Sequence, residues 1–251
     1  QLLTDGAVSE LAGYIDFAHW PEQSYKFTSE LQLPEIRRGF FDGANWELDG
    51  RGHFDGVFHK YKGGYDVTGT ISSPLFGVQT TFGRYPFPNI SGQVHWMPHR
   101  LDVMTLTSEF HGGRAVQGYS LAPLGEPTPP TASWDVRYEG VDLTAFGDSL
   151  GWPVFRMAGR ATGRNYLQWT SGHFGPTKHG SGEIASVAPD NAALTTPTVP
   201  EGYQPVIKDG PFDAKRRLSP YAMSGRVAYT WQPTYMRSEE HTSELQSRET
   251  I

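Results

Sequence analysis

The sequence predicts an all-β protein, built on one long, curved antiparallel sheet that forms an open half-pipe, with one short helix near 142–150. Two observations lead to this fold class. Apolar and polar residues alternate with a period of two along several segments, as in strands whose two faces meet different surroundings. Gly-Gly turns join such segments, and a chain with 29 glycines and 19 prolines favours turns over helices.

Residues 46–59 read as one unbroken strand, far longer than the usual strand of about five or six residues. Its apolar face carries Trp46, Leu48, Gly50, Gly52, Phe54, Gly56 and Phe58. Its polar face carries Glu47, Asp49, Arg51, His53, Asp55, Val57 and His59. An apolar face of this length must be shielded from water, so the function depends on which group shields it.

The same alternation predicts further strands at 13–18, 25–33, 65–72, 90–96, 101–110, 115–122, 132–138, 155–163, 180–187 and 224–232. Residues 34–40 are predicted to form a turn or a helical turn. Asp142 is the expected N-cap of the short helix, with Leu143, Phe146 and Leu150 on one side. Two hairpin turns, at 62–64 and 111–114, share one pattern of aromatic residue and glycines, which hints at a repeating sheet unit.

The chain is expected to divide into four parts. Residues 1–187 form the elongated sheet, 188–210 a flexible Pro/Thr-rich loop, and 211–236 a truncated continuation of the sheet. Residues 237–251 are expected to be a non-native tail, because Arg237–Ser247 reads as the translation of a standard short-read sequencing adapter. The biological chain is therefore expected to stop near Met236, inside a longer protein.

Composition excludes several classes of function. The formal net charge is −6, and the sequence contains no run of Lys or Arg, so nucleic acid is not expected as a partner. The chain has no cysteine, which rules out disulfides, thiolate metal sites and cysteine nucleophiles. No stretch approaches the roughly 20 apolar residues of a membrane-spanning helix. No cofactor and no metal site are predicted.

The motifs that could carry chemistry have simpler interpretations. Gly147–Gly151 matches the Gly-x-Ser-x-Gly pattern of serine hydrolases, but Ser149 is predicted to lie in a short helix rather than on a nucleophile elbow. His53 and His59, like Asp49 and Asp55, are about 20 Å apart within one strand, too far for a shared site. A solvated polar face is the favoured interpretation.

The apolar face leaves two alternatives open: an ordinary sandwich or barrel core, or a curved surface for an apolar guest. Gly50, Gly52 and Gly56 weaken a strand and mark places where a sheet bends or another group approaches closely. Large aromatic residues that alternate with glycines would suit a curved sheet around a flexible guest.

From about Ile15 to Trp231 the sequence resembles the AsmA-like superfamily, in particular the translocation and assembly module (TamB) family of Gram-negative bacteria. The segments that carry the resemblance are strand and turn patterns: Phe17–Tyr25, Gly52–Phe58, Lys62–Gly64, Glu109–Arg114, Tyr138–Leu143 and Met157–Arg164. The resemblance implies a half-pipe with an apolar lining, in a periplasmic protein whose parent is anchored in the inner membrane by a helix outside this chain. It also implies movement of phospholipids towards the outer membrane and an outer-membrane barrel partner bound through regions absent here.

The leading hypothesis is therefore a non-enzymatic part of a groove that conducts phospholipid acyl chains. The residues expected to line it are Trp46, Leu48, Phe54, Phe58, Tyr65, Val67, Ile71, Ile90, Val94, Trp96, Trp134 and Val136. The alternatives are a structural or adhesive β-domain with a closed core and, less favoured, a serine hydrolase that uses Ser149.

Overall fold

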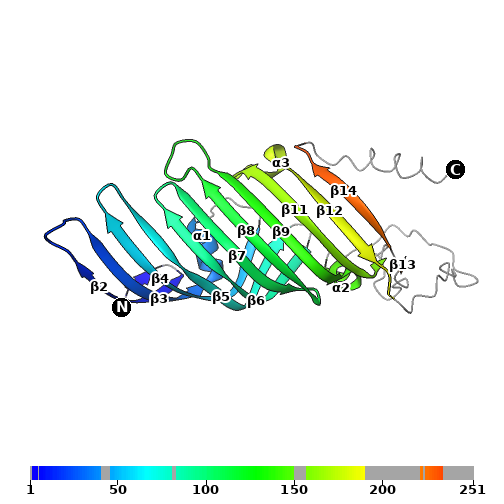
Figure 1. Cartoon of the computed structure of the whole chain (residues 1–251), viewed down its shortest axis with the longest axis horizontal. Coiled ribbons are helices and arrows are strands. Elements are labelled where there is room, and N and C mark those ends of the chain that lie inside the picture. The colour runs from blue at the N-terminus through cyan, green and yellow to red at the C-terminus, as the bar shows by residue number, and fades with distance from the viewer. Residues whose placement is uncertain are drawn as a thin grey trace, which may run out of the picture.

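The computed structural model describes residues 2–4, 6–40, 46–80, 83–149, 157–189, 221–222 and 224–233. Twelve of its strands form one sheet in the order β1-β2-β3-β4-β5-β6-β7-β8-β9-β11-β12-β14, and every neighbouring pair in it is antiparallel (Figure 1). Within this sheet the strands lie side by side in chain order, with β10 and β13 left out, so the sheet is a long meander. The predicted all-β fold with one open antiparallel sheet is confirmed.

The strands of this sheet are β1 (Leu2–Thr4), β2 (Ala7–Ile15), β3 (Gln23–Gln32), β4 (Glu47–Tyr61), β5 (Gly64–Thr80), β6 (Gly83–Met97), β7 (Arg100–Phe110), β8 (Gly113–Ala122), β9 (Thr131–Asp142), β11 (Arg160–Thr170), β12 (His179–Val187) and β14 (Gly225–Trp231). Two short strands, β10 (Met157–Ala158) and β13 (Tyr221–Ala222), pair in parallel. The helices are α1 (Leu33–Phe40), α2 (Leu143–Ser149) and α3 (Phe174–Thr177).

Both predicted glycine turns are hairpins. The first joins β4 to β5, with Gly63 at a φ of 100°. The second joins β7 to β8, with His111 at 44° and Gly112 at 73°, the two positive φ values that a tight hairpin turn uses. The predicted 46–59 strand is β4, which begins one residue later and continues to Tyr61.

The sheet is strongly curved, because its longest strands bend. Backbone irregularities with positive φ interrupt the alternation at Gly50 in β4, Asn89 in β6 and Thr105 in β7. In Figure 1 the far ends of β4–β6 turn back behind β7–β9. Stacked rings join the two layers there, since the centroids of Phe87 and Phe110 are 5.1 Å apart.

Helix α1 packs on the apolar face of β4. Leu33, almost fully buried, lies over Gly50 and Gly52 at a distance that a Cβ on either glycine would meet as ordinary van der Waals contact. The group that leaves no room for a side chain at Gly50 is the carbonyl oxygen of Leu75 on β5. Arg37 is buried as well, and its Nε donates to the carbonyl of Trp46 at 2.8 Å. The close approach expected from the sequence is made at Gly50 by the backbone of the neighbouring strand β5, while α1 lies above both glycines in ordinary contact.

Helix α2 begins as predicted. The Asp142 carboxylate accepts hydrogen bonds from the backbone N–H groups of Thr144 at 2.8 Å and Ala145 at 3.1 Å. Leu143 is buried with Val141 and Ala161, while Phe146 packs against this small cluster. The predicted third member of the apolar side, Leu150, lies outside the described residues.

Loss of this cap gives the first testable prediction. Asp142→Ala leaves two helix N–H groups without an acceptor, and we expect it to lower the free energy of unfolding by about 0.5–2 kcal/mol. Urea denaturation followed by circular dichroism measures the change. Asp142→Asn retains an acceptor oxygen and should recover most of the loss. Equal destabilisation by both variants would contradict the assigned role.

Most of the sheet carries only a shallow core. Thirteen hydrophobic residues are buried, but no large side chain of the described residues is fully buried. The predicted loop 188–210 lies outside the described residues apart from 188 and 189, as does the whole predicted tail 237–251. Strand β14, from the predicted continuation at 211–236, joins the main sheet beside β12.

Candidate functional site

One row of directly opposed residues crosses the sheet from β2 to β14, and every member is apolar, aromatic or glycine. We call it the apolar row: Leu11, Phe27, Gly56, Gly69, Val94, Val103, Tyr119, Trp134, Leu167, Gly180 and Trp231. Opposed residues of an antiparallel pair lie on the same face. The apolar character of this face is therefore continuous over eleven strands.

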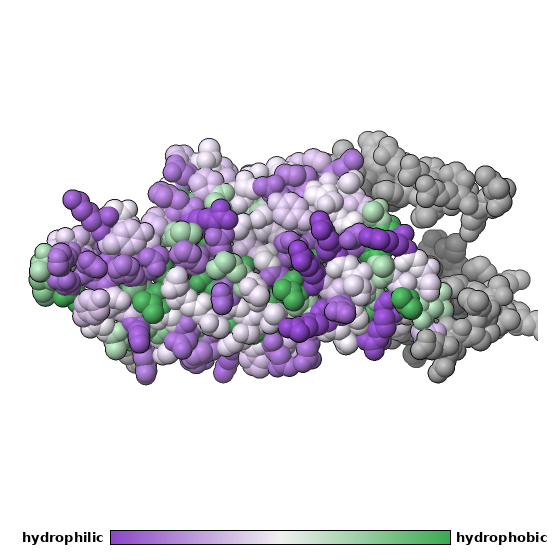
Figure 2. Space-filling model, viewed as in Figure 1, coloured by the Kyte–Doolittle hydropathy of each residue, from purple (hydrophilic) through white to green (hydrophobic). Residues whose placement is uncertain are grey.

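The next row along the strands lies on the opposite face and is polar except for Ala12 and Val57. It contains Ala12, Lys26, Val57, Thr68, His95, Asp102, Ser120, Ser133, Gln168 and His179. Figure 2 shows hydrophilic residues over much of the front of the molecule, where strands β7–β12 run. The sheet is amphipathic along its whole width.

The register brings most of the predicted lining residues onto the apolar face. Phe58 opposes Val67, which opposes Trp96; Phe54 opposes Ile71. Ile90 and Val94 come from β6, and Leu48 precedes Phe54 on β4, with Trp46 just before the strand. Tyr65 follows the same alternation on β5 and packs against Trp96, with ring centroids 6.1 Å apart. Trp134 and Val136 lie three strands away on β9, linked through Val103 and Tyr119.

Aromatic rings on the apolar face lie flat against the sheet, over glycines, instead of projecting away from it. The Phe54 ring covers Gly56 and Gly69, which oppose each other on β4 and β5. It also packs on Phe27, with centroids 5.2 Å apart, and is only 8% exposed. Tyr138 over Gly163 and Tyr229 over Gly182 repeat the arrangement. The glycines thus keep the apolar face shallow.

Exposure rises towards the edges of the sheet. Phe54, Val136 and Leu167 are buried among neighbours on the same face, whereas Leu11 on β2 and Val227 on β14 are exposed. Burial raises the pKa of Tyr119 to about 12, and that of Tyr138 likewise. The neutral phenol is favoured because water is excluded from the middle of the apolar face.

A few polar groups interrupt the apolar face, and most are paired. Ser9 and Ser29 share a hydrogen bond of 2.7 Å, and Asn165 accepts from Tyr229 and Trp231. Gln117 accepts from the Trp134 indole at 3.1 Å. Its Nε2 is a buried donor with no partner among the described residues, as Ser108 Oγ is.

The candidate catalytic groups of the polar face are ordinary surface residues. His53 pairs with Glu30 at 2.7 Å, and His59 lies 3.7 Å from both Glu22 and Asp66. Among the described residues, no group of three His, Asp or Glu side chains is placed to hold a metal ion. Helices in the same part of the chain are too short or too polar to cross a membrane.

The structure brings together two residues, Ser149 and His111, that no sequence pattern relates to each other. Ser149 Oγ lies 3.4 Å from His111 Nε2, although 38 residues separate them. The serine donates at 2.7 Å to the carbonyl of Phe146, at the C-terminal end of α2. This end of a helix carries negative partial charge, which opposes a developing oxyanion. No ion pair reaches His111 among the described residues.

The surroundings of His111 predict a pH-dependent stability. Its ring lies against Phe110 and Phe146, and burial lowers its pKa, with Asp142 acting weakly in the other direction. A folded-state pKa below the unfolded value of 6.5 means that the unfolded chain binds the proton more readily. We expect His111 to contribute stability above pH 6.5 that is lost as pH falls below it.

His111→Asn, which tolerates a positive φ, should flatten this acid loss in urea denaturation between pH 7 and pH 5. His19 provides a control of opposite sign, because its hydrogen bond to Asp16 raises its pKa and makes its contribution larger at low pH. His19→Asn should therefore steepen the acid loss. An unchanged slope in His111→Asn would remove His111 as its source.

Several residues of the apolar face are not among the lining residues that the sequence predicts. Val103 and Tyr119 complete the apolar row, and Phe27 and Leu167 extend it on either side. The alternation in β3 and β8 contains the signal for Phe27 and Tyr119. In β7 the irregularity at Thr105 breaks the alternation. Odd-numbered residues such as Val103 lie on the apolar face before it, and even-numbered residues such as Leu106 lie there after it.

Comparison of the chain with protein-family models, with curated proteins and with solved structures gives no match. The sheet and its surfaces are therefore the basis for a function.

Proposed function

We propose that the chain is a segment of a lipid-conducting β-groove, in which phospholipid acyl chains lie against the apolar face. The observation that carries the proposal is the apolar row, which is unbroken over eleven strands; in the described part of the chain the only other sheet is the two-stranded β10–β13 pair. Acyl chains would displace water from this face at about 25 cal/mol per Å², without directional contacts. Because the apolar row is continuous across the strands, an acyl chain could slide from one strand to the next without needing a polar partner.

The proposal also includes the kind of parent protein that the sequence resemblance implies. The chain would belong to an AsmA-like, TamB-type protein of the periplasm, with its parent anchored in the inner membrane and an outer-membrane barrel as partner through other regions. The fold and the one-sided apolar surface support this assignment. The acyl chains themselves are the partners of this segment, and it carries out no chemical step.

Photo-crosslinking tests the groove directly. Benzoylphenylalanine in place of Phe54 keeps an aromatic ring on the apolar face, while the same residue at Asp55 points from the next position on the same strand to the polar face. After incubation with phospholipid vesicles and irradiation, we expect lipid adducts from position 54 and not from position 55. Adducts from neither position would favour a domain with a sealed core.

The hydrolase alternative has its own test, prompted by the contact between Ser149 and His111. A fluorophosphonate probe labels an activated serine covalently. We expect no labelling of the chain, because the Ser149 hydroxyl proton is engaged by the Phe146 carbonyl. Labelling that disappears in Ser149→Ala would establish a nucleophile and overturn the non-enzymatic assignment.

A further inference from the structure

The polar face contains a hollow lined by an unusual concentration of arginines. The hollow has a volume of about 760 Å³, and residues from β8, β9, β11, β12 and β14 surround it. We call it the arginine hollow; its charged members are Arg114, Arg137, Arg164, Arg226, Glu139 and Glu183. Four arginines and two glutamates give it a net charge of +2, within a chain whose net charge is −6.

The positive charge of the hollow is only partly compensated, because Glu139 opposes Arg114 and Glu183 opposes Arg164 on neighbouring strands. Arg226 pairs with Glu183 at 2.7 Å, and that pairing lowers the pKa of Glu183. Arg114, Arg137 and Arg164 form no hydrogen bond or ion pair within the described residues. Three guanidinium groups therefore retain their full capacity to donate hydrogen bonds.

Two of these arginines are directly opposed across neighbouring strands. Arg137 of β9 and Arg164 of β11 are register partners, which places their Cβ atoms about 4.5–5.5 Å apart. Like charges in this arrangement are destabilising. An anion held between the two would relieve the repulsion, and guanidinium groups bind phosphate oxygens in pairs, with matching planar geometry.

Nearby carboxylates limit what the hollow can accept. Asp135 and Glu139 lie two residues before and after Arg137 on the same face, each about 7 Å along the strand. Glu183 opposes Arg164 on the side away from Arg137. These three carboxylates would repel an extended polyanion but leave room for one compact phosphate group between Arg137 and Arg164. This arrangement favours a single phosphate over nucleic acid.

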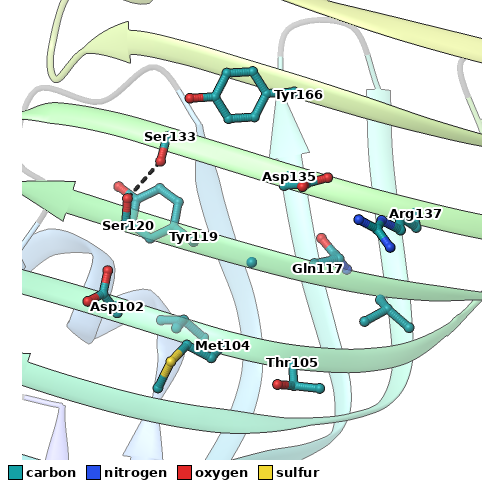
Figure 3. Close-up of a pocket in the computed structure, with 13 residues that line it drawn as sticks. Asp102, Met104, Thr105, Gln117, Tyr119, Ser120, Ser133, Asp135, Arg137 and Tyr166 are labelled. Atoms are coloured by element: carbon teal, nitrogen blue, oxygen red, sulfur yellow. Dashed lines mark hydrogen bonds between the residues drawn. The ribbon is translucent and has the colours of Figure 1, made fainter.

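A second hollow of about 420 Å³ shares Val116 and Arg137 with the first. Figure 3 shows Tyr166, Asp135 and Arg137 around it, with Ser120 and Ser133 joined by their 2.7 Å hydrogen bond. Asp135 and Tyr166 oppose each other, and neither is paired within the described residues. A flat tyrosine ring beside hydroxyl and carboxylate groups suits a group rich in hydroxyls.

We propose that the two hollows together bind the phosphate ester of a polyhydroxylated group, with the phosphate between Arg137 and Arg164 and the hydroxyl-bearing part beside Tyr166. Such a group exists as a soluble sugar phosphate and as a phospholipid headgroup with free hydroxyls, and the recognition chemistry is the same for both. The site lies on the face opposite the apolar row, so it is independent of the proposed groove.

Isothermal titration calorimetry of the full chain tests this with glucose 1-phosphate, glucose and vesicles of phosphatidylcholine with or without phosphatidylglycerol. We expect binding of glucose 1-phosphate, or of phosphatidylglycerol-containing vesicles if the source is a lipid, and no binding of glucose. The double variant Arg137→Ala/Arg164→Ala should weaken binding at least about tenfold. Rising salt should weaken binding as well, because the arginines are exposed.

Arg51→Ala is the matched control, since Arg51 is an exposed arginine of the polar face on β4, outside the hollow. It should bind like the parent chain. Binding of neither probe, or equal loss in Arg51→Ala and the double variant, would overturn the proposal. All of these variants leave the apolar face unchanged, so failure here is separate from failure of lipid crosslinking at Phe54.

Discussion

Val94→Glu is expected to lower lipid crosslinking from position 54 about a hundredfold, while His95→Glu leaves it unchanged. Val94 stands in the middle of the apolar row, between Gly69 on one side and Val103 on the other. A carboxylate there would have to lose water against acyl chains, at a cost of about 2.5–3.5 kcal/mol by analogy with a charge inside a bilayer.

The comparison of Val94 with His95 separates the effect of the apolar face from any general effect of a charge on strand β6. The two residues are neighbours on β6, and His95 belongs to the polar row. Both variants place the same charge at almost the same backbone position, so a difference between them reports on the apolar surface alone. Urea denaturation should first establish that both variants are folded. Equal crosslinking in the two variants would refute the groove.

Gly69→Val is expected to destabilise the sheet by about 1–3 kcal/mol, the usual cost of overpacking. A Cβ at Gly69 would come within 2.5 Å of Phe54 Cζ and of the Asp55 carbonyl oxygen. The Phe54 ring would have to leave the surface of Gly56 and Gly69 and stand upright. The same substitution should therefore lower lipid crosslinking, because an upright ring obstructs the apolar row.

Thr68→Val is the control for this prediction. Thr68 precedes Gly69 on β5 but is exposed on the polar face, where an added methyl group meets no ring. We expect its free energy of unfolding to stay within about 0.5 kcal/mol of the parent value. If urea denaturation gives Gly69→Val and Thr68→Val the same stability, the ring does not depend on the glycine beneath it.

The Phe54 ring also revises how the glycines of β4 are understood. In the sequence, Gly50, Gly52 and Gly56 indicate places where a guest could approach the strand. In the structure, the Leu75 carbonyl oxygen approaches Gly50 and the Phe54 ring covers Gly56, whereas Gly52 has room for a Cβ. Close approach at Gly50 and Gly56 was predictable because only glycine leaves that space. The identity of the approaching group was not, since it depends on how a neighbouring strand and a ring pack.

The contact between Ser149 and His111 had no signal in the sequence. The two residues belong to different elements, and they meet only because α2 folds against the turn between β7 and β8. In the same way, Arg137 and Arg164 are unremarkable in the sequence, and only the register between β9 and β11 makes them partners.

The sequence by itself determined the fold class, the positions of the turns and the character of each face. These features follow from local rules: side chains alternate along a strand, and glycine supplies the backbone conformations that tight turns need. Only the tertiary structure decided that eleven alternating segments align into one apolar row, and that two arginines oppose each other on the other face. Alignment depends on the register between strands and on irregularities such as Thr105, which shift the alternation by one residue and are set by pairing across the sheet.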